Sequence, residues 1–253
     1  MNQNMKKYLQ ELCEIYEFNK NAESLVDSGS LPDADENGNF YSVPSMTFKY
    51  LLKYYGFDSQ PKVVSNDEYY HLDTSEMFHG FQEYDHGVNF LQDNDYHFGN
   101  GKIYGFYGSW DDYTAEKYTA TFFRNPYDAD KGKVLGFKVA SNNYATRDQL
   151  DYLLEISPDN YENIDDERVR EKMQSLKIFY SKLQECGENV EEYSKWIKNF
   201  IASDMSCFAV YLGFDYLYNA ARDERIVYNR GKVVVTQNSI DRFNEGASER
   251  AWF

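Results

Sequence analysis

Apolar residues near the start of the chain recur every three or four positions. Between Met5 and Asn19 this spacing predicts an amphipathic helix. A second run with the same spacing predicts a helix that is capped by Ser45 and ended by Gly56. Its apolar positions are Phe48, Leu51, Leu52 and Tyr55. We expect these helices to form an N-terminal accessory region over residues 1–64.

From residue 65 the pattern changes to short apolar runs separated by Gly, Asn and Asp, which is typical of β-strands. The candidate strands are Glu76–Phe81, Lys102–Tyr107, Thr119–Phe123 and Lys133–Ala140. Helical spacing returns over about 146–203, and β-rich runs follow at Cys207–Leu217 and Glu224–Thr236. This order of elements predicts an α+β fold rather than alternating βαβ units. We therefore expect a second domain over 65–253 with a helical insertion at about 146–203.

Composition and charge narrow the class of protein. The chain has 253 residues, of which 42% are hydrophobic and 18% aromatic, and this excludes a disordered chain. Its 42 acidic and 26 basic residues give a net charge of −16. That charge disfavours binding of nucleic acid mainly through its phosphates, although a local basic patch stays open. An acidic mimic of nucleic acid is the alternative that such a charge allows.

The expected location is the cytoplasm. No apolar run approaches the roughly 20 residues of a membrane helix, so no membrane partner is expected. The segment Met1–Lys20 lacks the apolar core of a signal peptide. The three cysteines, which are widely spaced, predict a reduced chain and fit no zinc site. Asp33–Gly38 is similar to the start of a calcium loop, but Pro44 stands where the bidentate Glu belongs, so no metal is expected.

Three short segments combine residue types that suit one chemistry. They are Met77–Gly80, Gly105–Ser109 with the following Ala115–Tyr118, and Asp223–Asn229. The rings of two tyrosines such as Tyr107 and Tyr118 can enclose a flat cationic ring such as nicotinamide. His79 places an imidazole beside the unshielded backbone of Gly80. Glu224 can accept a hydrogen bond from a ribose hydroxyl and stabilise positive charge on the sugar.

Each of these residues also has a plain structural interpretation when it is taken alone. A single histidine such as His79 is more often structural than functional. A chain with 24 tyrosines contains pairs with the spacing of Tyr107 and Tyr118 by chance. A glutamate before an apolar run, as at position 224, is usually a solvated strand end. The functional interpretation depends on the order and context of the three segments together.

In that order the segments resemble the motifs of ADP-ribosyltransferases of the His-Tyr-Glu class, the class of diphtheria toxin and the poly(ADP-ribose) polymerases. That family has Tyr-His-Gly or a similar run at the end of its first core strand, matched by 78–80. It has Gly-Phe-Tyr or Gly-Ile-Tyr and then a second tyrosine at a fixed spacing, matched by 105–107 and Tyr118. Its catalytic glutamate opens Glu-Tyr-Ile-Val-Tyr, matched by 224–228. The run 212–215 is similar to the Leu-Gly-Tyr-Asp of phage and bacterial members.

The resemblance covers about residues 65–236, and it implies a fold of two small packed β-sheets around an NAD cleft. By position, His79 would bond the adenosine-side ribose of NAD, and the backbone of Gly80 would bond the nicotinamide carboxamide. Tyr107 and Tyr118 would enclose the nicotinamide ring. Glu224 would bond the nicotinamide ribose and orient or deprotonate the acceptor. The implied catalytic residues are Glu224, His79 and Tyr107, with NAD as substrate and no metal.

The implied activity is mono-ADP-ribosylation by a bacterial or phage toxin, effector or defence enzyme. The expected partners are NAD, an acceptor that is either protein or nucleic acid, and a cognate inhibitor or antitoxin. Ala115 stands where the polymerases have serine, and Arg222 stands where arginine-modifying members have Glu or Gln. Arg230 and Lys232 lie close to the motif and are expected at a solvated strand edge. The alternatives are an NAD glycohydrolase and a non-catalytic interaction protein.

Overall fold

A computed structural model describes most of the chain. The described residues are 3–29, 42–81, 84–92, 105–110, 115, 133–185, 200, 205–220 and 224–245. They form two compact units. The helical unit contains the described residues of 1–55 and 147–214, and the sheet unit those of 56–98, 105–146 and 215–253. Of the predicted elements, Thr119–Phe123 lies outside the described residues, and so does Tyr118.

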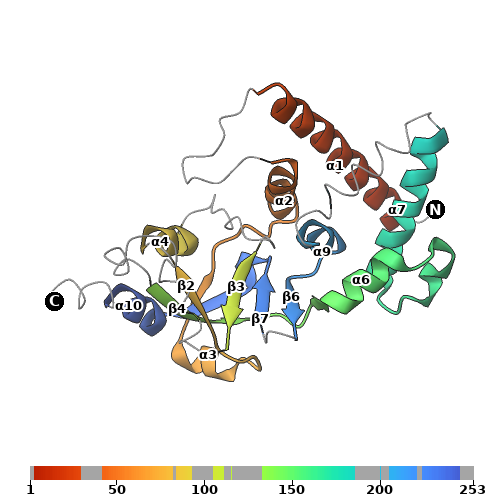
Figure 1. The fold of residues 1–253 in the computed structure, drawn as a ribbon. Helices are drawn as coiled ribbons and strands as arrows, with labels where there is room; N and C mark the ends of the chain where they lie inside the picture. The colour runs from red at the N-terminus through yellow and green to blue at the C-terminus, as the bar shows by residue number, and fades with distance from the viewer. Residues whose placement is uncertain are drawn as a thin grey trace. The chain divides into compact units, whose positions relative to one another are not determined.

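The helical unit joins the N-terminal helices to the segment before the last strands (Figure 1). Its elements are α1 (Gln3–Asp27), α2 (Val43–Tyr54), α6 (Arg147–Glu155), the 3₁₀ helix η2 (Pro158–Asn163), α7 (Glu167–Glu185) and α9 (Ser206–Leu212). Helix α1 packs against α2 and α7, and α2 packs against α9. The predicted helices over 5–19 and after residue 45 are confirmed, and α1 extends further at both ends.

The cap of α2 lies earlier than predicted. Ser42 is the N-cap: its Oγ accepts from the Ser45 amide at 3.3 Å. In return, Ser45 Oγ accepts from the Ser42 amide at 3.1 Å, which completes a capping box. The other end agrees with the prediction, because Gly56 follows the helix with a φ of +68°.

The β-rich prediction for Cys207–Leu217 is wrong over most of its length. Residues 206–212 form helix α9, and only the strand β6 (Tyr216–Asn219) follows. Every residue of α9 is buried. A run that is apolar on all sides shows neither the helical nor the strand period, so its sequence does not distinguish the two.

The sheet unit contains an open sheet of eight strands. The other strands are β1 (Lys62–Val64), β2 (Met77–Phe81), β3 (Phe106–Ser109), β4 (Lys133–Val139), β5 (Tyr144–Thr146), β7 (Glu224–Val227) and β8 (Val233–Thr236). Their order is β1-β8-β4-β2-β3-β7-β6-β5; β1/β8 and β5/β6 pair in parallel, and the other pairs are antiparallel. The helices of the unit are α3 (Asn66–His71), α4 (Tyr84–Gln92), the 3₁₀ helix η3 (Arg230–Lys232) and α10 (Gln237–Glu245). The chain is therefore a mixed α and β protein, as expected in general terms.

The hydrogen-bonded order differs from the expected pair of separate sheets, and β4 accounts for the difference. Its first five residues, 133–137, pair with β2, whereas 138 and 139 pair with β8. One strand thus joins β1 and β8 to the remaining strands.

Aromatic rings fill the core of the sheet unit on one side of β2, β3 and β4. Phe90 of α4 stacks on Phe106 of β3 with ring centroids 4.0 Å apart. Phe243 of α10 and Phe81 of β2 meet at 5.7 Å, and Phe137 of β4 lies 4.9 Å from Phe106. We call this side of the strands the phenylalanine face. Full burial of each such ring contributes about 1.5–3 kcal/mol, so this cluster anchors α4 and α10.

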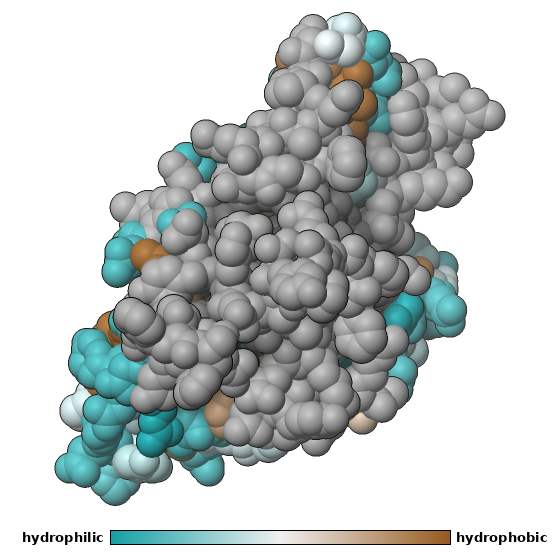
Figure 2. Space-filling view, turned by 60° about the vertical axis from the view of Figure 1, so that its left-hand side comes forward, coloured by the Kyte–Doolittle hydropathy of each residue, from teal (hydrophilic) through white to brown (hydrophobic). Residues whose placement is uncertain are grey.

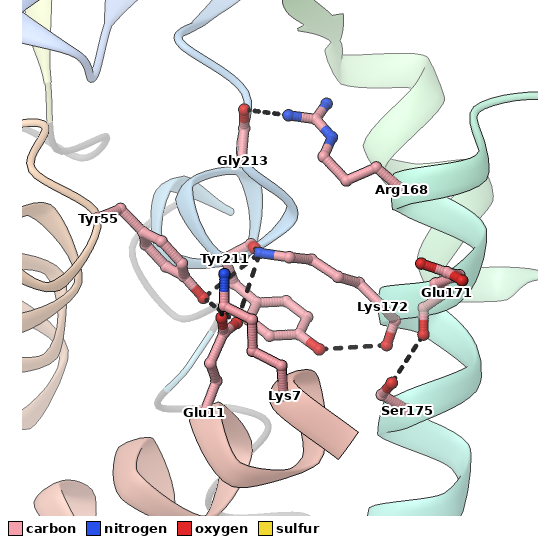
Figure 3. Close-up of polar contacts among 9 residues, drawn as sticks. All are labelled: Lys7, Glu11, Tyr55, Arg168, Glu171, Lys172, Ser175, Tyr211 and Gly213. Carbon is pink, nitrogen blue, oxygen red and sulfur yellow. Dashed lines mark hydrogen bonds and ion pairs between the residues drawn. The ribbon is translucent and has the colours of Figure 1, made fainter. Parts of the chain in front are cut away.

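A buried lysine lies among four elements of the helical unit (Figure 3). Lys172 of α7 donates to the carbonyl oxygen of Tyr211 in α9, and its Nζ lies 3.8 Å from Glu11 Oε2 of α1. The rings of Tyr8, Tyr55 and Tyr211 lie 4.4–5.3 Å from the same nitrogen. Burial lowers the pKa of Lys172 to about 8, and Glu11 opposes that shift.

Arg230 does not lie at a solvated strand edge as expected. It is only 1% exposed. Its guanidinium donates to the backbone carbonyl oxygens of Ser59 at 3.0 Å, Phe90 at 3.3 Å and Asp58. Lys232 keeps partial exposure. The guanidinium of Arg230 is therefore a buried group that hydrogen-bonds two other segments of the sheet unit, 58–59 and the helix α4, rather than a ligand contact.

The described surface is mixed in character. On the face in Figure 2, hydrophilic residues predominate among those that are coloured, and the hydrophobic ones occur in small groups. None of the helices in the described part of the chain is both long enough and apolar enough to cross a membrane.

Candidate active site

The three motif segments, far apart in the sequence, occupy adjacent strands. In the order β2-β3-β7, β2 carries His79 and Gly80, β3 carries Tyr107, and β7 begins at Glu224. Figure 1 shows β2, β3 and β7 side by side. Antiparallel pairing holds β3 and β7 together over four residue pairs.

Glu224 lies in a transverse row at the end of these strands. It pairs with Ser109 of β3, and Ser109 pairs with Phe78 of β2. On its other side Glu224 pairs with Asn219 of β6, whose Nδ2 donates to Glu224 Oε2 at 3.4 Å. Glu224 is 9% exposed. A carboxylate that is so well shielded from water interacts strongly with positive charge that develops beside it.

Tyr107 lies on the same face of the strands as Glu224. Tyr107 pairs with Ile226, which stands two positions after Glu224 in β7. Side chains two positions apart in a strand, and those of directly paired residues, point to the same side. Tyr107 is partly exposed, as are Phe78 and Ser109. We call this side of the strands the Glu224 face.

His79 points the other way, into the phenylalanine face. Its ring lies 4.1 Å from that of Phe106 and 4.5 Å from that of Phe81. Phe106 precedes Tyr107 in β3, so its side chain and the rings it contacts lie on the side opposite Tyr107 and Glu224. The structure thus brings Tyr107 and Glu224 together and places the imidazole of His79 behind them.

The contact of His79 with β3 runs through the backbone. His79 Nδ1 lies 2.5 Å from the carbonyl oxygen of Tyr107. A carbonyl oxygen only accepts, so Nδ1 carries the proton and Nε2 the lone pair. Burial lowers the pKa of His79 to about 4, against the opposing effect of this hydrogen bond. The imidazole is therefore neutral at pH 7 and fixes the backbone that carries Tyr107.

Gly80, the proposed carboxamide contact, is buried in β2 and pairs with Val134 of β4. The small residue Ala115 is also buried. Gly105, which opens the Gly-Phe-Tyr motif, has a φ of +146°. A Cβ there would lie 2.5 Å from Ile226 Cγ2, so this position requires glycine both for its backbone and for its close contact with β7.

Asp215, the last residue of the run 212–215, ties the neighbouring strands together. Its carboxylate accepts from Asn229 Nδ2 at 2.6 Å and from Ser141 Oγ at 2.5 Å. Its carbonyl oxygen accepts from the amides of Tyr228 and Asn229. The residue that resembles the family's Asp thus has a structural role: it fixes the far end of β7, the strand that carries Glu224.

Sequence reasoning missed Ser109 and Asn219 as neighbours of Glu224. A signal was present, because Asn219 and Glu224 flank the short connection between two strands and therefore face each other across the β6–β7 pair. Among the described residues, no three His, Cys, Asp or Glu side chains gather as metal ligands would. Comparisons with protein-family models, with curated proteins and with solved structures found no match.

Proposed function

We propose that the chain is a mono-ADP-ribosyltransferase that cleaves NAD between nicotinamide and ribose and transfers ADP-ribose to a macromolecule. The observation that supports this most is the adjacency of β2, β3 and β7. Three segments that resemble one family's motifs thus converge, with Glu224 buried at the head of its strand. We also propose that the division of the sheet at β4 corresponds to the boundary between the two sheets of that fold.

In this proposal the Glu224 face receives the nicotinamide end of NAD. Tyr107 offers one ring face to the nicotinamide, and Tyr118 is expected to offer the other. The Glu224 carboxylate accepts from a hydroxyl of the adjoining ribose. The backbone of Gly80 is the proposed contact for the carboxamide.

The placement of His79 changes its proposed role. Because its imidazole lies on the phenylalanine face, it acts as a positioning residue: Nδ1–H holds the carbonyl of Tyr107. The adenosine-side ribose is then bound by other groups. By fixing the backbone of β3, His79 orients the ring of Tyr107 towards the substrate.

The reaction breaks the bond between ribose C1 and the nicotinamide nitrogen. Nicotinamide leaves with the bonding electrons, and the sugar becomes oxocarbenium-like. The negative charge of Glu224, in its dry position, stabilises that cation more than it stabilises the ground state. The acceptor's nucleophile then bonds to C1 and loses its proton.

The test is incubation of the purified chain and a cell lysate with labelled NAD. Free nicotinamide reports bond cleavage, and label in nuclease-sensitive or protease-sensitive material reports transfer and the acceptor class. Glu224→Gln should lower nicotinamide release by about 100-fold or more and leave NAD binding nearly unchanged, because the carboxylate acts on the transition state. Tyr107→Ala should also weaken NAD binding, because it removes a stacking face.

The matched control is Glu68→Gln, which neutralises an exposed carboxylate of α3 in the same unit and should release nicotinamide at the wild-type rate. Wild-type turnover in Glu224→Gln would refute the assignment of Glu224. Nicotinamide release without macromolecular label would replace the transferase with an NAD glycohydrolase. Absence of release from the wild-type chain would refute the enzymatic proposal and favour an interaction protein.

A further inference from the structure

A strip of three aromatic rings and one guanidinium crosses four consecutive strands of the sheet unit. It consists of Trp110, directly after β3, Arg225 of β7, Tyr216 of β6 and Tyr144 of β5. The Arg225 guanidinium carbon lies 5.6 Å from the Trp110 ring and 5.4 Å from the Tyr216 ring. Tyr216 stacks on Tyr144 at 5.2 Å with an interplanar angle of 23°. We call these four residues the aromatic strip.

The two ends of the aromatic strip are open to solvent. Trp110 is 37% exposed and Tyr144 is 44% exposed, which is high for large aromatic side chains. The ladder pairs Tyr216 with Val227 and Val227 with Phe106, so the strip lies on the phenylalanine face. Helices α4 and α10 pack on β2, β4 and β8, on the other half of that face. Tyr216, at 4% exposed, belongs to the buried core, so the strip offers stacking faces to solvent at its two ends, Trp110 and Tyr144.

Arg225 carries donors that the described part of the chain does not satisfy. Its Nε and Nη1 are buried and have no hydrogen-bond partner among the described residues. These two atoms are shielded from solvent, but Arg225 as a whole is only partly buried, so an acceptor from outside would approach the accessible remainder of the residue. Two ring faces and one guanidinium suit a flat base with an attached phosphate, because the base stacks while the phosphate accepts from arginine.

The aromatic strip begins beside the candidate active site. Arg225 directly follows Glu224, and Trp110 directly follows Ser109, which is paired with Glu224. Glu224 is the first residue of β7, and its partners Ser109 and Asn219 are the last residues of β3 and β6. The strip lies on the opposite side of the sheet, so a ligand bound to it would reach the Glu224 face by passing these strand ends. An acidic peptide would pair with the guanidinium but leave both ring faces uncovered, which favours a nucleotide unit.

We infer that the aromatic strip binds single-stranded nucleic acid and that this strand is the acceptor of ADP-ribose; the acceptor role rests on the proposed function. A base stacks on Trp110 or Tyr144, and its phosphate accepts from Arg225. In the transfer, a nitrogen of the neighbouring base bonds to ribose C1 as the bond to nicotinamide breaks. Nicotinamide leaves with the electron pair, and the proton of the base nitrogen passes to Glu224 or to water.

The net charge of −16 sets the expected mode of binding. A protein of this charge would repel a long nucleic acid that it had to bind through many phosphates. The expected contact therefore covers few nucleotides and depends on base stacking. With a single arginine on a phosphate, the logarithm of the association constant should fall with the logarithm of salt concentration with a slope of about −0.7. A protein that tracks many phosphates would give a slope several times steeper.

The experiment measures binding of a labelled single-stranded oligonucleotide of about six nucleotides, as DNA and as RNA, by fluorescence polarisation without NAD. Tyr144→Ala and Arg225→Gln should each weaken binding by about 5- to 150-fold, the effect of losing a stacked base or a charged contact. Tyr152→Ala is the matched control, because it removes a tyrosine that is 55% exposed on α6, and it should bind as the wild type does.

Circular dichroism of each variant confirms that it is folded. Affinity within about twofold of wild type in both strip variants would overturn the inference. Nicotinamide release by the wild-type chain is measured separately. Release without oligonucleotide binding would overturn the strip alone, whereas binding through the strip without release would overturn the proposed enzyme and the acceptor role.

Discussion

Replacement of Lys172 by methionine tests whether the buried cation of the helical unit is as poorly solvated as its surroundings indicate. Methionine keeps the length of the side chain but removes the titrating group. In the folded chain Nζ contacts Glu11, the Tyr55 hydroxyl and the Tyr211 carbonyl, and burial lowers the pKa of Lys172 to about 8 (Figure 3). In the unfolded chain the pKa returns to its ordinary value of 10.5.

The sign follows from proton binding. Between about pH 8 and pH 10.5 the unfolded chain holds the Lys172 proton and the folded chain does not, so wild-type stability rises with pH in that window. The difference in pKa corresponds to about 3 kcal/mol. The free energy of unfolding of the wild type, minus that of Lys172→Met, should therefore increase by up to about 3 kcal/mol as pH rises through the window.

The assay is urea denaturation followed by circular dichroism at several values between about pH 7 and pH 10. Titration of the neighbouring tyrosines occurs in both proteins and cancels to first order in the difference. Lys177→Met is the control for loss of a lysine from α7: Lys177 is 43% exposed and pairs with Asp159 at the surface, so its loss should cost less than about 1 kcal/mol. A wild-type minus Lys172→Met difference that stays flat with pH would refute the reasoning.

Two further predictions concern the sheet unit. Arg230→Lys should lower the free energy of unfolding by about 2–4 kcal/mol, measured by denaturation, because one ammonium cannot reach the carbonyls that the planar guanidinium joins; an unchanged midpoint would contradict this role. His79→Gln should remove a loss of stability that the wild type shows as pH falls from 6.5 towards 4, since the unfolded chain binds the proton there and the folded chain resists it. The control is His71→Gln, which replaces an exposed histidine, and equal acid sensitivity of wild type and His79→Gln would count against the lowered pKa of His79.

The helices were predictable where one side is apolar and the other polar. In α1 and α7 the apolar residues keep a spacing of three or four, and both helices form where that spacing is found. Helix α9 was misassigned because all its residues are buried, which erases the periodic signal. The cap at Ser42 was missed because Ser42 and Ser45 share the capping box, and either serine is a reasonable N-cap from sequence alone.

Part of the candidate site was accessible from the sequence. Motif order identified the three strands, which the structure places next to one another. The side of the sheet to which each side chain points could not be predicted from the sequence, because it depends on strand register. A shift of one position along β2 would move His79 from the phenylalanine face to the Glu224 face. The aromatic strip was hidden for the same reason: Tyr144, Tyr216 and Arg225 meet only through pairing across three strands.

Strands β2, β3 and β7 are two-sided, with Phe81 and Phe106 behind them and Tyr107 and Glu224 in front. The proposed reaction surface thus rests on a packed aromatic layer. Any exchange of those rings that preserved folding would still tilt the strands by fractions of an ångström, a displacement that catalysis detects more readily than stability does. New specificity in such a fold would have to arise first from residues at the edge of the Glu224 face, because the strands beneath that face also carry the aromatic core.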